Sequence, residues 1–151
     1  QGVIIDQVVE TNNDGECYNP ETDCWTPICP MKYRRKSCAA AVLNGKIYVV
    51  GGCDDNYNDL DCVERYDPAT DTWTTLKSTQ RARSSATLAV SCGKLFAFGG
   101  CKGAKSTVEM YCPDTDTWVD RAHMILQPDE VYVGTLPIPA TFPSRLADVK
   151  R

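Results

Sequence analysis

The sequence lacks the features that would point to a membrane protein, a nucleic-acid-binding protein or a secreted chain. None of its apolar runs is long enough to cross a membrane as a helix. Acidic residues outnumber basic ones by 20 to 16, which argues against nucleic acid as the main partner, because phosphate binding needs a cationic surface. The first residues show no basic region followed by an apolar core, so we expect no signal peptide. The missing initiator Met is what we expect of a fragment or a processed chain.

Histidine is almost absent, and this restricts the chemistry available to the chain. His123 is the only histidine, so a catalytic triad or a two-histidine metal site would be hard to assemble. The sequence also has no G-x-S-x-G motif and no glycine-rich loop that opens a helix to hold phosphate. We therefore expect no enzymatic activity and no cofactor.

Cysteine, in contrast, is abundant, with nine residues spread over the chain. An odd number at such even spacing is a poor disulfide framework, so we expect reduced thiols and a cytoplasmic protein. Lys102 and Lys36 could lower the pKa of the nearby thiols Cys101 and Cys38 and make them redox-active; buried inert thiols are the simpler interpretation. A zinc site is disfavoured, because its four candidate ligands do not show paired knuckle spacing. These candidates are Cys17, Cys24, Cys29 and Cys38.

Two motifs recur along the chain at intervals of 45 to 48 residues. The first places a Tyr seven positions before a Trp, with a Pro and a Thr-Asp pair between them. Its three copies contain Tyr18 and Trp25, Tyr66 and Trp73, and Tyr111 and Trp118. The second motif spans residues 35–52 and matches residues 83–100 in register, including the pairs Gly51-Gly52 and Gly99-Gly100. Such self-similarity indicates a repeat architecture.

Each repeat is predicted to form four short strands. The first covers 38–43 or 86–90, the second 47–50 or 95–98, and the third 61–66 or 107–111, and the fourth begins at Trp73 or Trp118. Asn44-Gly45 predicts a tight hairpin, since both residues tolerate positive φ, and each Gly-Gly pair should end a strand. Four short antiparallel strands at this period are typical of propeller blades. The predicted fold is therefore all-β.

These residues resemble the kelch repeat, whose diagnostic positions are a Gly-Gly pair followed by a Tyr and then a Trp. The segments NGKIYVVGG and YDPATDTW are most similar to the kelch-like proteins, which carry BTB and BACK domains ahead of a six-bladed propeller. The resemblance covers residues 16–124. It implies a partial kelch β-propeller of four-stranded antiparallel blades, about two and a half in number.

The repeats predict a division of the chain into three parts. Residues 1–15 would be an N-terminal end or a strand of a preceding blade, and 16–124 the kelch repeats. Within these we expect a partial blade to residue 25 and blades at about 35–82 and 83–124. Residues 125–151 would be a divergent, proline-containing tail with one strand at 130–135. Because propellers typically need four to eight blades, missing blades, closure with another chain and an open stack all remain open.

The binding surface is expected where the connections after the second and fourth strands meet. In a meander these connections emerge on one face, and here they are residues 26–36, 53–60, 74–83 and 101–106. They differ most between repeats, and loops on a rigid scaffold are where binding usually occurs. We predict that Tyr33, Arg34, Tyr57 and Arg81 contact a protein partner or substrate peptide, since Arg suits carboxylates and Tyr anchors interfaces. Solvated loop side chains are the alternative.

Two further arginines are expected to have a different role. Arg35 and Arg83 recur in register, which favours a structural function over a specific contact.

The resemblance implies a protein–protein interaction module rather than an enzyme. One hypothesis is the substrate-recognition propeller of a cullin-type ubiquitin ligase adaptor, reaching the cullin machinery through domains outside this sequence. The alternative is a cytoskeletal kelch protein that binds or cross-links actin. A kelch-type oxidase is disfavoured, because those enzymes use His and Tyr as copper ligands and this chain has a single His.

Overall fold

The computed structural model describes residues 2–4, 11–100 and 106–124, and their regular secondary structure consists entirely of β-strands. The all-β prediction is therefore confirmed. Over the same residues there is no helix with the length and apolarity needed to cross a membrane. The strand predicted at 130–135 and the tail that contains it lie outside the described residues.

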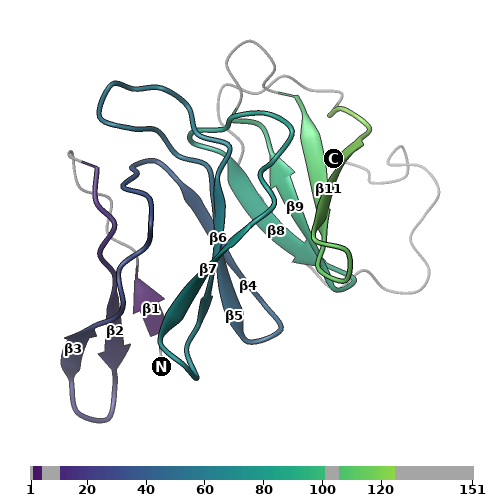
Figure 1. Cartoon of the computed structure of the whole chain (residues 1–151). Helices are drawn as coiled ribbons and strands as arrows, with labels where there is room; N and C mark the ends of the chain where they lie inside the picture. The colour runs from purple at the N-terminus through teal and green to yellow at the C-terminus, as the bar shows by residue number, and fades with distance from the viewer. Residues whose placement is uncertain (1, 5–10, 101–105, 125–151) are drawn as a thin grey trace, which may run out of the picture.

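The strands form three antiparallel sheets that stand side by side in chain order (Figure 1). The first sheet has three strands, β1 (Gly2–Ile4), β2 (Glu16–Asn19) and β3 (Cys24–Pro27). The second contains β4 (Ala39–Leu43), β5 (Lys46–Val50), β6 (Val63–Asp67) and β7 (Thr72–Leu76). The third contains β8 (Thr87–Ser91), β9 (Lys94–Phe98), β10 (Val108–Cys112) and β11 (Thr117–Arg121). The last two are the four-stranded blades that the repeats predicted.

Tight turns with positive φ set the strand register. Asn44 and Gly45 have φ of 52° and 71°, as predicted, and Cys92 and Gly93 repeat this geometry with 50° and 67°. The Asp of each Thr-Asp pair also has a left-handed φ of about 50°, at Asp23, Asp71 and Asp116. Aspartate tolerates this conformation better than most residues, which explains why Thr-Asp recurs before each Trp strand.

The main apolar core lies between the second and third sheets. Val50, Val63 and Leu95 are fully buried in it. The Tyr48 and Tyr111 rings meet there with centroids 5.8 Å apart. Burying this apolar surface is the main favourable contribution to folding, and a single sheet could not achieve it alone.

The Gly-Gly pairs lie where other segments of backbone approach closely. Gly51 has φ of 64°, and a Cβ at this position would come within 2.1 Å of the Arg83 carbonyl oxygen. The neighbouring Gly52 N–H donates to that same oxygen at 2.7 Å. A Cβ on Gly100 would come within 2.7 Å of Ala86, which directly precedes β8 of the same sheet. The prediction that glycine is needed here for close approach is confirmed.

Candidate functional site

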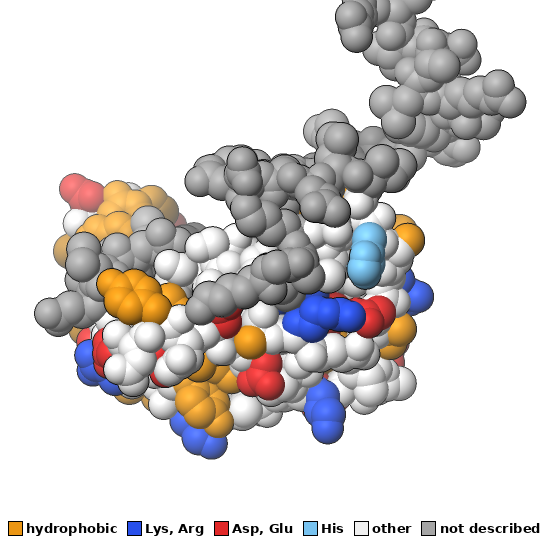
Figure 2. Space-filling view, turned by 90° about the horizontal axis from the view of Figure 1, so that it is seen from above, with side chains coloured by type: hydrophobic (Ala, Val, Ile, Leu, Met, Phe, Trp, Pro, Cys, Tyr) orange, Lys and Arg blue, Asp and Glu red, His pale blue; other side chains and the backbone are white. Residues whose placement is uncertain are grey.

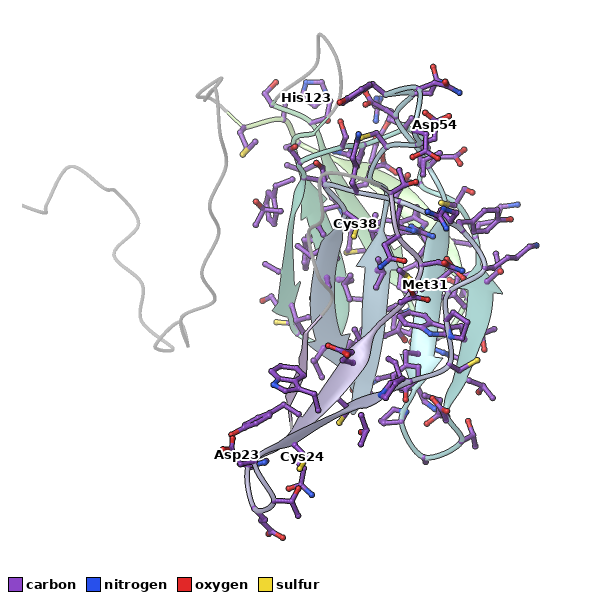
Figure 3. All side chains as sticks on the ribbon, turned by 90° about the vertical axis from the view of Figure 1, so that its left-hand side faces the viewer. Asp23, Cys24, Met31, Cys38, Asp54 and His123 are labelled. Carbon is purple, nitrogen blue, oxygen red and sulfur yellow. The ribbon has the colours of Figure 1, made fainter. Side chains whose placement is uncertain are left out.

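The long connections between strands gather at one end of the sheets. Residues 28–38, 51–62 and 77–86 run along the upper end in Figure 1, whereas the hairpin turns point to the lower end. Figure 3 places Asp54 and His123 at the first end and Asp23 and Cys24 at the other. We call the first end the loop face. The prediction that these connections share one face is confirmed; residues 101–105 of the fourth connection lie outside the described residues.

Two buried ion pairs bind backbone groups at the base of the loop face. Arg35 pairs with the Glu64 carboxylate, and both side chains are almost completely buried. The Arg35 guanidinium also donates to the carbonyl oxygens of Gly51 and Cys62, each at 3.0 Å. These bonds tie the end of β5 to the chain that enters β6.

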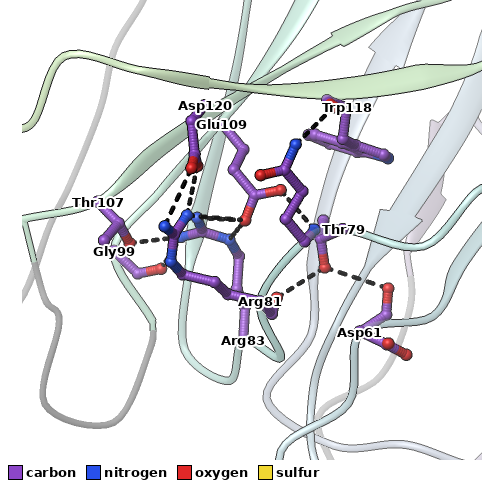
Figure 4. Close-up of polar contacts among 10 residues, drawn as sticks. Asp61, Thr79, Arg81, Arg83, Gly99, Thr107, Glu109, Trp118 and Asp120 are labelled. Carbon is purple, nitrogen blue, oxygen red and sulfur yellow. Dashed lines mark hydrogen bonds and ion pairs between the residues drawn. The ribbon is translucent and has the colours of Figure 1, made fainter.

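The third sheet repeats this arrangement (Figure 4). Arg83 pairs with Glu109 at 2.7 Å and also donates to the Gly99 carbonyl and the Thr107 hydroxyl. The structural role favoured for Arg35 and Arg83 is therefore confirmed. Their partners were missed from the sequence, although Glu64 and Glu109 also recur in register, each two positions before the Tyr.

Tyr57 stands at the tip of a loop with a fixed shape. The Asp54 carboxylate accepts hydrogen bonds from the backbone N–H groups of Asn56 and Asn58, at 2.9 and 2.8 Å, and from the Asn58 side-chain amide. These bonds hold the pKa of Asp54 below its usual value. Tyr57 has φ of 60° and its side chain is 66% exposed. The Lys36 amine lies 3.7 Å from its ring centroid, a cation–π contact.

Arg34 lies close to this loop. Its guanidinium donates to the Thr11 carbonyl at 2.7 Å, and the Thr11 hydroxyl donates to Asp55. The hydrogen bond from Thr11 lowers the pKa of Asp55, with smaller contributions from the charges of Arg34 and Lys36. The structure thus brings two of the predicted contact residues, Arg34 and Tyr57, into one cluster. We call it the Tyr57 patch, made of Arg34, Lys36, Asp55 and Tyr57.

The other two predicted residues lie elsewhere on the loop face. Tyr33 is half-buried, with the Lys32 amine 5.0 Å from its ring centroid. Arg81 lies on the connection to the third sheet, where its guanidinium makes two bonds to the Asp120 carboxylate (Figure 4). This pairing lowers the pKa of Asp120. A partner carboxylate would have to compete with Asp120 for Arg81; partner contact by the four residues stays a prediction.

Acidic and basic side chains are interspersed over the loop face. Figure 2, which views this end, shows Lys and Arg side chains next to Asp and Glu side chains. A partner with strong charge of a single sign would therefore meet repulsion as well as attraction here.

At Cys38 the structure favours the simpler interpretation, an inert thiol, over redox activation. Burial raises the pKa of Cys38, and the Lys36 amine lies over Tyr57, so the idea that Lys36 activates Cys38 is wrong. Cys101 and Lys102 lie outside the described residues. A lowered pKa is found instead at Cys112, whose sulfur accepts a hydrogen bond from Lys94 at 2.9 Å. The described cysteines are free, and no three metal-binding side chains cluster among the described residues.

Comparison with known proteins agrees with this geometry. The family model described as Kelch motif matches residues 34–80 and 82–125. Human influenza virus NS1A-binding protein is 49% identical over 47 residues, which are 31% of this chain and 7% of that protein. Human Kelch-like protein 23 is 54% identical over 37 residues, which are 24% of this chain and 7% of that protein. The chain therefore spans only a small part of the curated relatives it matches.

A solved structure supports the same fold. The structure of YjhT superposes with a TM-score of 0.63 at 16% identity, over 74% of this chain and 45% of that chain. Together with the family matches, this confirms the kelch propeller fold expected from the Gly-Gly, Tyr and Trp motifs. The chain belongs to the kelch-repeat family.

Proposed function

We propose that this chain is a protein-interaction module that binds a segment of another protein on its loop face, with the Tyr57 patch at the centre. Its kelch repeats and the kelch proteins among its relatives support a role in protein–protein interaction. The observation that carries the proposal is Tyr57 itself, a large side chain that is 66% exposed on a loop braced by Asp54. A rigid, exposed aromatic loses little conformational freedom on binding, which is why tyrosine is enriched among interface hot spots.

The chemistry of the patch favours a partner segment that combines an apolar side chain with a carboxylate. The Lys36 amine lies over the Tyr57 ring, and because Tyr57 is 66% exposed, an apolar side chain of a partner can reach it. Arg34 is exposed and retains donors beyond its bond to Thr11. A guanidinium binds carboxylates with defined geometry. Asp55 would discourage purely acidic partners and so contribute to specificity.

At a finer level, we propose that the module recruits substrates for a cullin-type ubiquitin ligase and acts in the cytoplasm without enzymatic activity. Support comes from the similarity to Kelch-like protein 23 and from the resemblance of the two complete repeats to kelch-like proteins. Actin binding is the alternative. A BTB domain upstream in the full-length protein would favour the ligase role, and cosedimentation of the chain with actin filaments would favour the cytoskeletal role.

The loop-face proposal is tested by comparing partner capture between variants. The chain is immobilised, partners retained from a cytosolic extract are identified by mass spectrometry, and their affinities are measured with purified proteins. Tyr57→Ala should weaken binding about 30-fold, the effect of a hot spot worth about 2 kcal/mol. Val42→Ala is the matched control, because Val42 is 63% exposed next to a hairpin at the opposite end. Equal binding by wild type and Tyr57→Ala would reject the proposal.

A further inference from the structure

A lysine and a cysteine are in direct contact at the hairpin end of the third sheet, opposite the loop face. Lys94 begins β9 and Cys112 ends β10, one position beyond the paired residues Leu95 and Tyr111. The Lys94 amine donates a hydrogen bond to the Cys112 sulfur, with the nitrogen and the sulfur 2.9 Å apart. Because the two residues lie on adjacent strands of one sheet, the pairing of β9 with β10 is enough to bring them together.

The second sheet makes the same contact with a carboxylate in place of the thiol. Lys46 begins β5 and forms an ion pair with Asp67, which ends β6. Asp67 directly follows the Tyr of its sheet, as Cys112 follows the Tyr of the third sheet. The repeat therefore places Cys112 at a position that holds an anion in the neighbouring sheet.

The groups around the Cys112 sulfur favour its deprotonated form. The Lys94 ammonium has donors and no acceptor, so it can bind the sulfur only as an acceptor. This bond lowers the pKa of Cys112, with smaller contributions from the Thr115 hydroxyl and the Asp114 backbone N–H. In return, the bond to the sulfur raises the pKa of Lys94. The pair is thus shifted toward thiolate and ammonium.

Other cysteines of the described residues have different surroundings. The exposed Cys24 thiol donates to the Thr22 carbonyl oxygen at 3.2 Å, which requires the protonated form. Burial raises the pKa of Cys38 and Cys62. Because the thiolate is the reactive form of cysteine, we expect Cys112 to react before these three.

The pair can also be reached from solvent. Cys112 is half-buried, and the Lys94 side chain is 30% exposed. In the second sheet, which stands between the other two (Figure 1), the side chains of Lys46 and Asp67 are still 33% and 26% exposed. Exposure at this position is therefore a property of the hairpin end of a blade and does not need a free sheet face.

We propose that Lys94 and Cys112 form a covalent sulfenamide cross-link when the protein meets a peroxide. The thiolate sulfur attacks one oxygen of hydrogen peroxide, and the O–O bond breaks to give a sulfenic acid. The departing hydroxide takes a proton from the Lys94 ammonium and leaves as water. The neutral amine then attacks the sulfur, the S–O bond breaks, and the hydroxyl leaves with a proton of the amine as a second water. The sulfur loses the two electrons that the peroxide gains.

Two features of the pair favour capture of the sulfenic acid by the amine. The Lys94 nitrogen already lies 2.9 Å from the sulfur, so the second step needs little rearrangement. The sulfenic acid carries no charge, so Lys94 loses the partner that held its proton. The new bond would tie β9 to β10, and by limiting the freedom of the unfolded chain it should stabilise the third sheet under oxidising conditions.

Mass spectrometry of the peroxide-treated protein tests this proposal. The purified 151-residue chain is treated with hydrogen peroxide and digested without reductant. We expect a linked pair of peptides that contain Lys94 and Cys112, lighter than the two separate peptides by two hydrogen atoms and released by dithiothreitol. Cys112 should react before Cys24. Chain unfolded in urea before treatment should lose both the link and this preference.

Two variants separate the cross-link from simple thiol oxidation. Lys94→Arg keeps a cation beside the sulfur but removes the amine nucleophile, so Cys112 should gain one oxygen atom, react with dimedone and form no link. Asp67→Cys places a thiol beside Lys46 and should create a second link, in the second sheet. Circular dichroism checks that both variants stay folded. Absence of the link in the folded wild-type chain, or its persistence in urea or in Lys94→Arg, would overturn the proposal.

Discussion

The second sheet and the first sheet contain the same motif in opposite surroundings. In the second sheet Tyr66 is only 3% exposed, and Glu64 is fully buried against Arg35. In the first sheet the equivalent Tyr18 is half-buried and the equivalent Glu16 is exposed. The local geometry is nevertheless the same, because the Tyr–Trp ring distances are 5.1 and 5.0 Å. The motif therefore fixes the local geometry of a sheet, whereas the packing of a neighbouring sheet decides whether its Glu and Tyr side chains are buried.

The largest expected difference between the sheets is the loss of stability when their glutamates are substituted. Glu64→Ala should destabilise the chain by about 3–5 kcal/mol, because it leaves the Arg35 guanidinium buried without its counter-ion. Glu16→Ala should change stability by less than about 0.5 kcal/mol, as exposed substitutions usually do. Urea unfolding followed by circular dichroism measures both. Equal losses would mean that the two sheets do not differ as described.

Glycine substitutions compare the stability cost at a hairpin turn with the cost at a close contact between two backbones. Gly45→Ala should cost about 1–2 kcal/mol, the usual penalty for a left-handed residue, since a Cβ there meets nothing within 4 Å. Gly51→Ala should cost clearly more, because its Cβ would also clash with the Arg83 carbonyl oxygen of the next sheet. The two variants are compared by their urea midpoints. If Gly45→Ala proved the more damaging, the close approach of the two backbones would be refuted.

The burial of Tyr66 in the second sheet should also make stability depend on pH in the alkaline range. Burial, followed by the bond to Asp71, raises the pKa of Tyr66 from its usual 10.0 to about 12. The unfolded chain therefore releases this proton first, so the stabilising contribution is complete below pH 10 and is lost as the pH rises toward 12. Stability measured across this window should fall more steeply for wild type than for Tyr66→Phe. Identical slopes would show that Tyr66 is not held protonated by the fold.

The smallest effect on stability is expected on the loop face. Tyr57→Ala should change the unfolding free energy by less than about 0.5 kcal/mol, because the ring is mostly exposed. Asp54→Ala should cost about 1 kcal/mol, since it removes three hydrogen bonds that shape the loop. Thermal unfolding of the two variants measures this order. A large loss on Tyr57→Ala would assign that side chain to the scaffold rather than to binding.

Residue types and their spacing along the sequence were enough to predict the repeats, the strands and the turns. Asn44 and Gly45 adopt positive φ, as their residue types require, and the Gly-Gly pairs end strands where backbones meet. The recurrence of Arg35 and Arg83 predicted a structural role, and the alternation of loops predicted a common face. These features depend on residues close together in the chain, or on a spacing that repeats, and both can be read from one sequence.

Tertiary structure alone decided which side chains meet. Trp73 binds the Cys29 carbonyl 44 positions earlier, and Arg81 meets Asp120 39 positions later. The raised pKa of Cys38 likewise depends on how it is buried. Such contacts are set by the packing of one sheet on the next, which no local pattern encodes. The same physical reason explains why one motif is buried in two sheets and exposed in the first.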